Sequence, residues 1–173
     1  MENYFELYGM EPGFAPDATI VRKRFLELSR EHHPDRFATA DVATRNTALR
    51  LSALNNEAYK TLQDPDRTMA YMLKLSGILE EEEKYNLPPA FLMEMMDLNE
   101  VVDSIAAAPE NVVPANNSLQ EQLAQWEQEV RPLLQQYAQG QHDEGTLKKI
   151  KDYYFRKKYL LRIQERLATF TPH

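Results

Sequence analysis

The chain contains no cysteine among its 173 residues, and it has only five glycines. The absence of cysteine excludes disulfides, zinc–thiolate sites and cysteine-ligated iron–sulfur clusters for this chain alone. Scarce glycine, together with stretches rich in Leu, Ala, Glu, Gln, Lys and Arg, favours helix over strand. Because 43% of the residues are hydrophobic, a packed core is also expected.

A surplus of positive charge and long apolar runs are absent as well. The net charge is −7, which argues against nucleic acid as the main partner and fits protein partners. No apolar run approaches the length of a membrane-spanning helix, and residues 1–10 are too acidic and polar for a signal peptide. We therefore expect a cytoplasmic protein with no membrane partner.

Residues 1–76 are expected to form one unit of amphipathic helices. Apolar residues recur at helical spacing over 18–33 and over 41–62, and a short apolar helix is expected at 4–8. Pro34 ends the first long helix, since the residue before a proline resists the α conformation. Two amphipathic helices joined by a tight loop should fold back as an antiparallel pair.

The remaining residues are interpreted as a linker over 77–87 and a bundle of three helices over 88–173. The acidic run Glu80–Glu83 is typical of a solvated linker and receives no function. A loop is expected over 111–117, and a kink or break at Pro132, which lies inside a helical stripe.

The tripeptide His33-Pro34-Asp35 falls at the tip of the predicted hairpin, directly after a basic helix. Pro34 stiffens this loop, and Asp35 offers a carboxylate for paired hydrogen bonds with an arginine. The basic side chains of the preceding helix would steer the approach of a partner. Those side chains are Arg22, Lys23 and Arg30.

Two other interpretations of this loop remain open. The residues could simply cap and turn a hairpin, because Pro and Asp are common in turns. Alternatively, His32, His33 and Asp35 could form the metal site of a hydrolase. Neighbouring residues in a loop rarely converge on one ion, so we treat metal binding as a minor alternative.

The helix over 88–107 carries apolar residues on two faces. At about 100° per residue, one stripe is assigned to the core; it comprises Phe91, Met95, Leu98, Val102 and Ile105. The opposite side combines apolar and acidic side chains, namely Leu92, Met93, Met96, Asp97, Glu100 and Asp103. Such a surface suits an adaptable protein partner. It could equally pack on the first unit or be ordinary scattered exposure.

Phe155 in the last helix is expected to point away from the core, among Lys and Arg side chains. An exposed aromatic ring among basic groups could anchor a partner. The ring could equally be covered by lysine stems.

The first 76 residues resemble the J-domain, the module by which co-chaperones stimulate DnaK-class ATPases. The likeness rests on the hairpin, on its basic helix, and on the sequence His33-Pro34-Asp35-Arg36-Phe37 at its tip. It implies that His33, Pro34 and Asp35 contact the ATPase, and that Arg22, Lys23 and Arg30 meet an acidic surface. The chain would then be no enzyme and would need no cofactor.

Over its whole length the chain is similar to the HscB family, the J-type co-chaperones of bacterial iron–sulfur cluster assembly. The residues that carry the likeness are Tyr4-Phe5-Glu6-Leu7, His33-Pro34-Asp35-Arg36-Phe37, Asp64-Pro65, Arg67, Ala70-Tyr71-Met72-Leu73 and Phe91-Leu92-Met93-Glu94. The likeness implies an all-α fold, with an N-terminal J-domain and a C-terminal three-helix bundle. The family's cysteine-rich N-terminal extension in eukaryotes is absent, which favours a bacterial-type protein.

The resemblance also implies the partners. The bundle would bind the scaffold protein IscU, and the J-domain would deliver that scaffold to the chaperone HscA or a DnaK-class equivalent. The scaffold-binding residues carried over by position are Leu92, Met93, Met96, Asp97, Glu100 and Phe155. Ser104 stands where the family often has another acidic residue. A general J-protein with a different client is the alternative within the same class.

Overall fold

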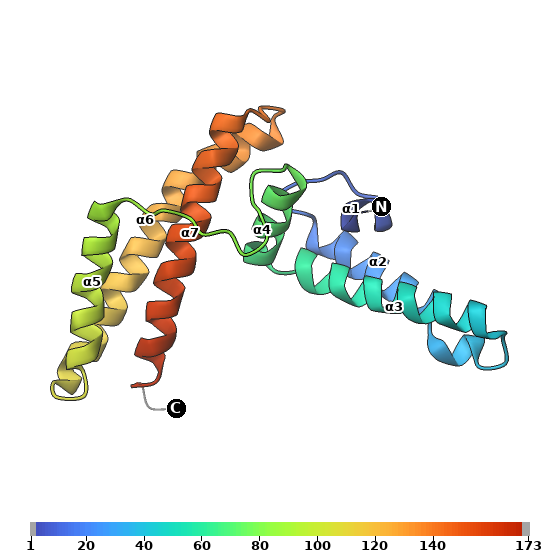
Figure 1. Cartoon of the computed structure of the whole chain (residues 1–173), viewed down its shortest axis with the longest axis horizontal. Helices are drawn as coiled ribbons and strands as arrows, with labels where there is room; N and C mark the ends of the chain where they lie inside the picture. Colours follow the sequence, from blue (N-terminus) through green and yellow to red (C-terminus); the bar gives the residue numbers. More distant parts are fainter. Residues whose placement is uncertain (1–2, 171–173) are drawn as a thin grey trace. The chain divides into compact units, whose positions relative to one another are not determined.

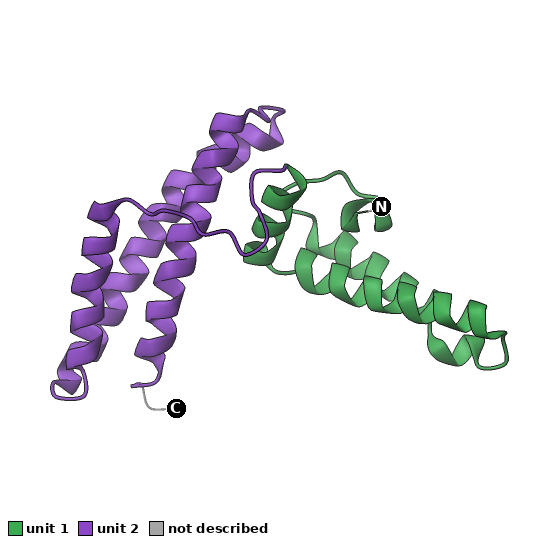
Figure 2. Cartoon of the chain, viewed as in Figure 1, with its two compact units in different colours: residues 1–76 green, residues 77–173 purple. Residues whose placement is uncertain are grey.

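A computed structural model describes residues 3–170 of the chain (Figure 1). All regular secondary structure in that range is helical, which confirms the all-α prediction. The chain divides into two compact units, residues 1–76 and 77–173 (Figure 2).

The first unit is built around two long helices that lie side by side and antiparallel (Figure 1). Its elements are α1 (Tyr4–Leu7), α2 (Ala18–Glu31), the 3₁₀ turn η1 (Pro34–Phe37), α3 (Val42–Leu62) and α4 (Pro65–Leu75). Asp17 caps α2 by accepting hydrogen bonds from the amides of Thr19 and Ile20. Asp64 caps α4 in the same way, and Pro65 occupies the first helical position.

A buried asparagine fixes how α2 lies against α3. The side chain of Asn55 is 1% exposed, and its amide donates to the Phe25 carbonyl oxygen and to Ser29 Oγ, both at 3.1 Å. Its Oδ1 accepts a hydrogen bond of 2.8 Å from the Tyr8 hydroxyl. Phe25 also stacks on Tyr59, with ring centroids 4.1 Å apart. These contacts set the register of the hairpin, because a buried polar group is stable only where its partners are in place.

The second unit contains three long helices packed around a common core. They are α5 (Pro89–Ser104), α6 (Val112–Ala138) and α7 (Glu144–Ala168), with a short 3₁₀ turn, η2 (Pro109–Asn111), before α6. The core includes Phe91, Met95, Val102, Leu119, Trp126, Ile150, Leu160 and Ile163. Trp126, the only tryptophan of the chain, packs against Phe91 at 5.7 Å between ring centroids.

The loop expected over 111–117 is wrong, because α6 already begins at Val112. Asparagine and proline in this stretch suggested a loop. However, Pro114 falls within the first turn of α6, where a missing amide proton leaves no helical hydrogen bond unmade. Ala115 and Leu119 are buried in the core, and this packing outweighs the weak helix propensity of the asparagines.

Pro132 does not break its helix. α6 runs from Val112 to Ala138 with Pro132 inside it. The helix is retained because Val130 and Tyr137, on either side of the proline, are buried in the bundle. Tertiary packing therefore compensates for the hydrogen bond that the proline cannot make.

Residues 77–87, predicted to be a linker, belong to the second unit and lie along α7. Leu79 is buried, and Lys151 Nζ donates to the Ile78 carbonyl oxygen at 2.9 Å. The same ammonium group pairs with Glu83 at 2.6 Å, with both side chains only 16% exposed. One carboxylate of the acidic run is therefore docked. Its partner lies 68 positions away along the chain, so the local charge pattern could not show it.

Candidate functional site

The His33-Pro34-Asp35 elbow lies at the end of the α2–α3 hairpin, where the chain reverses between the two helices (Figure 1). His33 has the extended backbone that a residue before proline requires, with φ −59° and ψ 131°. It caps η1, since its Nδ1 accepts a hydrogen bond of 3.2 Å from the Asp35 amide. The side chains of His33 and Asp35 remain 57% and 92% exposed. The elbow is therefore ordered by its own hydrogen bonds yet open to a partner.

The hydrogen bond at Nδ1 determines what His33 can offer. A neutral imidazole that accepts at Nδ1 carries its proton on Nε2, so Nε2 is the hydrogen-bond donor. The exposed carboxylate of Asp35 lies 3.7 Å from Nδ1, the other nitrogen of the ring. The elbow thus presents one donor and one anionic acceptor within three residues of chain.

Arg36 attaches the elbow to the end of α2. Its Nη1 donates to the Arg30 carbonyl oxygen at 3.2 Å, which satisfies one of the last acceptors of the helix. This contact positions η1 relative to α2. In the sequence, Arg36 stands out only as part of the motif, because its role depends on a contact that spacing does not reveal.

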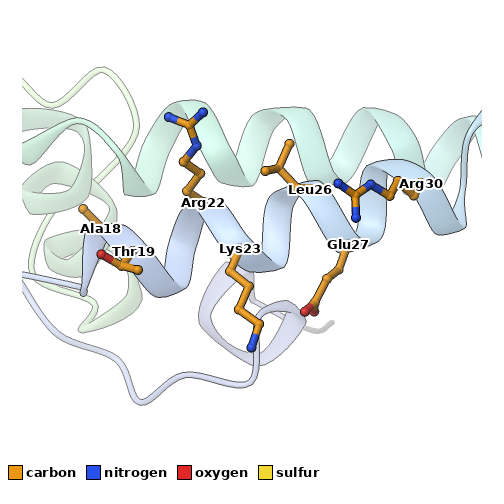
Figure 3. Close-up of a pocket in the computed structure, with 7 residues that line it drawn as sticks. All are labelled: Ala18, Thr19, Arg22, Lys23, Leu26, Glu27 and Arg30. Carbon is orange, nitrogen blue, oxygen red and sulfur yellow. The ribbon is translucent and has the colours of Figure 1, made fainter.

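The exposed face of α2 is basic. Arg22, Lys23 and Arg30 are exposed there, and within the described range none of them forms an ion pair. They line a shallow hollow of about 620 Å³ together with Ala18, Thr19, Leu26 and Glu27 (Figure 3). Arg24, the other basic residue of α2, instead pairs with Glu27 at 2.6 Å and bonds the Tyr8 carbonyl oxygen. Since Arg24 neutralises Glu27, the hollow is left with a positive surface.

The outer face of α5 is exposed, and its inner face is in the core. Leu92, Met93 and Met96 are 37%, 66% and 60% exposed, and the side chains of Asp97 and Glu100 are exposed as well. Asp103, assigned to the same face, instead pairs with Arg166 of α7, which also hydrogen-bonds Asn99. Ser104, the last residue of α5, hydrogen-bonds the Val101 carbonyl oxygen at 2.7 Å.

Phe155 is half-buried rather than freely exposed. Its ring stacks on Tyr85 with centroids 4.5 Å apart and planes 6° apart, and it meets Tyr154 edge-on at 5.2 Å. Tyr85 is in turn fixed by a hydrogen bond of 2.8 Å from its hydroxyl to Asp152. Burial and this carboxylate raise the pKa of Tyr85 to about 12. The ring is therefore covered on one side by another aromatic ring.

Leu92 and Phe155 meet at a single groove of about 360 Å³. The residues that line it are Glu83, Tyr85, Asn86, Leu87, Leu92, Phe155, Lys158, Tyr159 and Arg162. Met93, Met96, Asp97 and Glu100 are not part of this lining. Sequence analysis missed Tyr85 and Leu87, because both lie outside the helices and show no periodicity.

The structure offers no support for the metal site considered above. Within residues 3–170 there is no cluster of three or more His, Asp or Glu side chains suited to holding a metal ion. His33 and Asp35 are exposed, whereas His32 is half-buried and lines a separate hollow with Phe37 and Leu51. None of the helices described is both long enough and apolar enough to cross a membrane.

Comparison with known proteins covers both units. Residues 87–168 match the family model described as the HSCB C-terminal oligomerisation domain. A co-chaperone protein HscB homolog of Bordetella avium is 32% identical over 173 residues, which is 99% of this chain and 98% of that protein. The chain belongs to the HscB family. The family resemblance predicted from the sequence is thus confirmed.

Other relatives agree over part or all of the chain. An HscB homolog of Vibrio cholerae is 42% identical over 106 residues, so the match spans 61% of this chain and 62% of that relative. The structure of the chaperone HscB from Vibrio cholerae superimposes with a TM-score of 0.81 at 30% identity, covering 96% of each chain. Human co-chaperone HscB gives a TM-score of 0.79 at 25% identity, covering 96% of this chain and 81% of the human one.

Proposed function

We propose that this HscB-family protein is a co-chaperone that stimulates an HscA- or DnaK-class ATPase through its elbow. The observation that carries the proposal is the exposed His33-Pro34-Asp35 turn at the end of the hairpin. The His33 Nε2 proton and the Asp35 carboxylate would bind polar groups of the ATPase, and Pro34 limits the conformational entropy lost on binding. Stimulation requires only that these contacts favour the active arrangement of the ATPase over its idle one.

The basic face of α2 would guide the encounter. Arg22, Lys23 and Arg30 are free of internal ion pairs in the described part of the chain, so their charge is available to an acidic surface. Charges of this kind raise the association rate more than they tighten the final complex. The protein itself would hydrolyse nothing, because ATP chemistry belongs to the partner.

The second unit would bind the client, an IscU-type iron–sulfur scaffold. Leu92, Met93 and Met96 supply exposed apolar area on α5, and Asp97 and Glu100 add negative charge beside it. Phe155 would contribute from the neighbouring groove. Binding client and chaperone on one chain raises the effective concentration of the client at the chaperone. We place this activity in the cytoplasm, in cluster assembly and transfer.

Steady-state ATP turnover by purified chaperone, with and without this protein and the scaffold, tests the proposal. We expect stimulation by the native chain, and its loss in His33→Gln with an unchanged circular dichroism spectrum and unchanged scaffold binding. His142→Gln, the same substitution in the second unit, is the matched control and should stimulate normally. Full stimulation by His33→Gln would contradict the proposed role of the elbow.

A general J-protein with a different client is the second candidate. Direct binding measurements with IscU separate the two. Stimulation of the ATPase without any affinity for IscU would favour that candidate, because the first unit would then act as proposed while the second served another protein.

A further inference from the structure

The groove beside Phe155 has apolar walls from three parts of the second unit. Tyr85 and Leu87 come from the segment before α5, Leu92 from α5, and Phe155 and Tyr159 from α7. Tyr159 also meets the core residue Phe91 edge-on at 5.9 Å, which ties this wall to the bundle core. The groove of about 360 Å³ therefore has apolar and aromatic walls attached to the bundle core, with polar side chains among its other lining residues.

One edge of this groove is positively charged. Lys158 and Arg162 line it, and they follow Phe155 by three and seven positions, so all three share one face of α7. Both side chains are exposed, and within the described residues neither has a carboxylate partner. Lys158 Nζ lies 5.9 Å from the centroid of the Tyr154 ring.

The residues that line the groove carry no free negative charge. Glu83 also lines it, but Lys151 pairs with that carboxylate at 2.6 Å. This pairing lowers the pKa of Glu83, so the carboxylate stays ionised and occupied near neutral pH. Lys158 and Arg162 therefore determine the charge that an occupant meets.

A positive groove is unusual in this unit. Residues 77–173 carry 16 acidic and 10 basic side chains, yet eight of the ten basic ones lie in α7, beside three acidic ones. Several of these are paired: Lys148 with Glu144, Lys151 with Glu83, Arg156 with Asp152 and Arg166 with Asp103. α5, in contrast, has four acidic residues and no basic one. The outer face of α5 is therefore negatively charged, whereas the groove beside α7 is positively charged.

We infer that the groove binds a surface segment of the scaffold protein that carries an apolar side chain next to an Asp or Glu. The apolar side chain would enter between Leu92 and Phe155, and the carboxylate would bind Lys158 and Arg162. This inference rests on the proposed scaffold-binding role and adds the chemistry of the segment recognised. Charge complementarity supports it, because two cations at the rim of an apolar hollow favour an anionic neighbour of a buried side chain.

Opposite charges on the two surfaces would also fix the orientation of the scaffold. A basic region of the scaffold would face Asp97 and Glu100, while its acidic segment lay in the groove. A scaffold turned by half a revolution would place like charges together at both surfaces, which disfavours that arrangement.

The test measures scaffold affinity by isothermal titration calorimetry on full-length protein. We expect Lys158→Glu with Arg162→Glu to weaken binding about tenfold at low ionic strength, and added salt to reduce that difference. Arg131→Glu, an exposed charge reversal on α6, is the control and should bind like the native chain. An unchanged circular dichroism spectrum and an unchanged fluorescence spectrum of the buried Trp126 would show that the bundle of the double variant is folded.

The outcomes separate this inference from the proposed function. If Leu92→Ala with Met96→Ala weakens binding but the charge reversal does not, the function stands and the inference is wrong. A native chain without affinity for the scaffold overturns both. Equal losses in Arg131→Glu and the double variant would indicate a general charge effect and overturn the inference. The inference would also be overturned if the native chain formed a concentration-dependent dimer and the double variant did not, since a second copy of the chain would then occupy the groove.

Discussion

At the scale of single residues, His33 divides its imidazole between two tasks. Nδ1 accepts a hydrogen bond from the Asp35 amide, and this bond orders the turn. The rest of the ring is open to solvent. A substitution of His33 can therefore remove either the hydrogen bond that orders the turn or the Nε2 donor that would bind a partner. Glutamine at position 33 keeps a polar side chain but cannot reproduce the planar ring with its two nitrogens, which is why we expect it to abolish stimulation while leaving the fold intact.

Asn55 is the residue on which the geometry of the hairpin depends most. Asn55→Ala removes the side-chain partner of the Tyr8 hydroxyl, which keeps the carbonyl oxygen of residue 55 as an acceptor. It also removes the donors to Ser29 and to the Phe25 carbonyl oxygen, and it leaves a small cavity. We expect the free energy of unfolding of the first unit to fall by about 2–3 kcal/mol. Urea denaturation followed by circular dichroism measures this. Asn56→Ala, an exposed neighbour on α3, should stay within about 0.5 kcal/mol of the native value, and equal effects of the two would refute the prediction.

At the scale of elements, α5 illustrates what helical periodicity can predict. The assignment of Phe91, Met95 and Val102 to the core and of Met93 and Met96 to the outside follows from spacing alone, and the structure agrees. Periodicity could not show that Asp103 pairs with Arg166, because that contact joins two helices. Nor could it show that Tyr85 covers Phe155, since their positions differ by 70 and Tyr85 is not in a helix.

The same limit explains two differences from the predicted boundaries of α6. Local composition predicts a loop before residue 118 and a kink or break at Pro132, whereas the helix begins at Val112 and continues through the proline without a break. In both places burial of neighbouring side chains in the bundle decides the outcome. The existence and type of each long helix were predictable, because its stripe is long. The ends depended on packing partners that the local sequence does not contain.

The outer face of α5 leads to a prediction about scaffold binding. Leu92→Ala with Met96→Ala removes two exposed apolar side chains without touching the core, so we expect scaffold affinity to fall by about 1–3 kcal/mol. Calorimetry measures the loss. Val113→Ala, which shortens an exposed apolar residue of α6 that is 66% exposed, should have no effect. If the double variant binds the scaffold as tightly as the native chain does, the side chains of Leu92 and Met96 are ordinary exposed residues with no part in binding.

The docked segment before α5 leads to a prediction about pH. The hydrogen bond from Lys151 lowers the pKa of Glu83 below its ordinary value of 4.5. The ion pair therefore stabilises the folded unit above about pH 4.5, and this contribution disappears as the pH falls through the lowered pKa. Glu83→Gln should be less stable than the native chain at pH 7, and the difference should shrink towards pH 3.

Urea denaturation between pH 3 and 7 checks this difference. Glu80→Gln, in the same acidic run but exposed, is the control and should follow the native curve. A constant difference between Glu83→Gln and the native chain at every pH would mean that the ion pair contributes nothing to stability.

At the scale of the whole molecule, the proposed adaptor needs both surfaces on one chain. An equimolar mixture of His33→Gln and the Leu92→Ala, Met96→Ala variant contains one intact elbow and one intact client surface, but on different molecules. We expect the mixture not to restore scaffold-dependent ATP turnover, because the gain in effective concentration is lost. Native turnover from the mixture would show that the two surfaces act independently.

The buried Trp126 gives the two units separate spectroscopic signals. It is the only tryptophan of the chain and lies in the core of the second unit, 6% exposed. Fluorescence excited selectively at the indole ring therefore reports on unfolding of the second unit alone, with no label and no substitution. The helical signal in the far ultraviolet reports on both units. A comparison of the two melting curves would show whether the hairpin and the bundle lose their structure in one transition or in two.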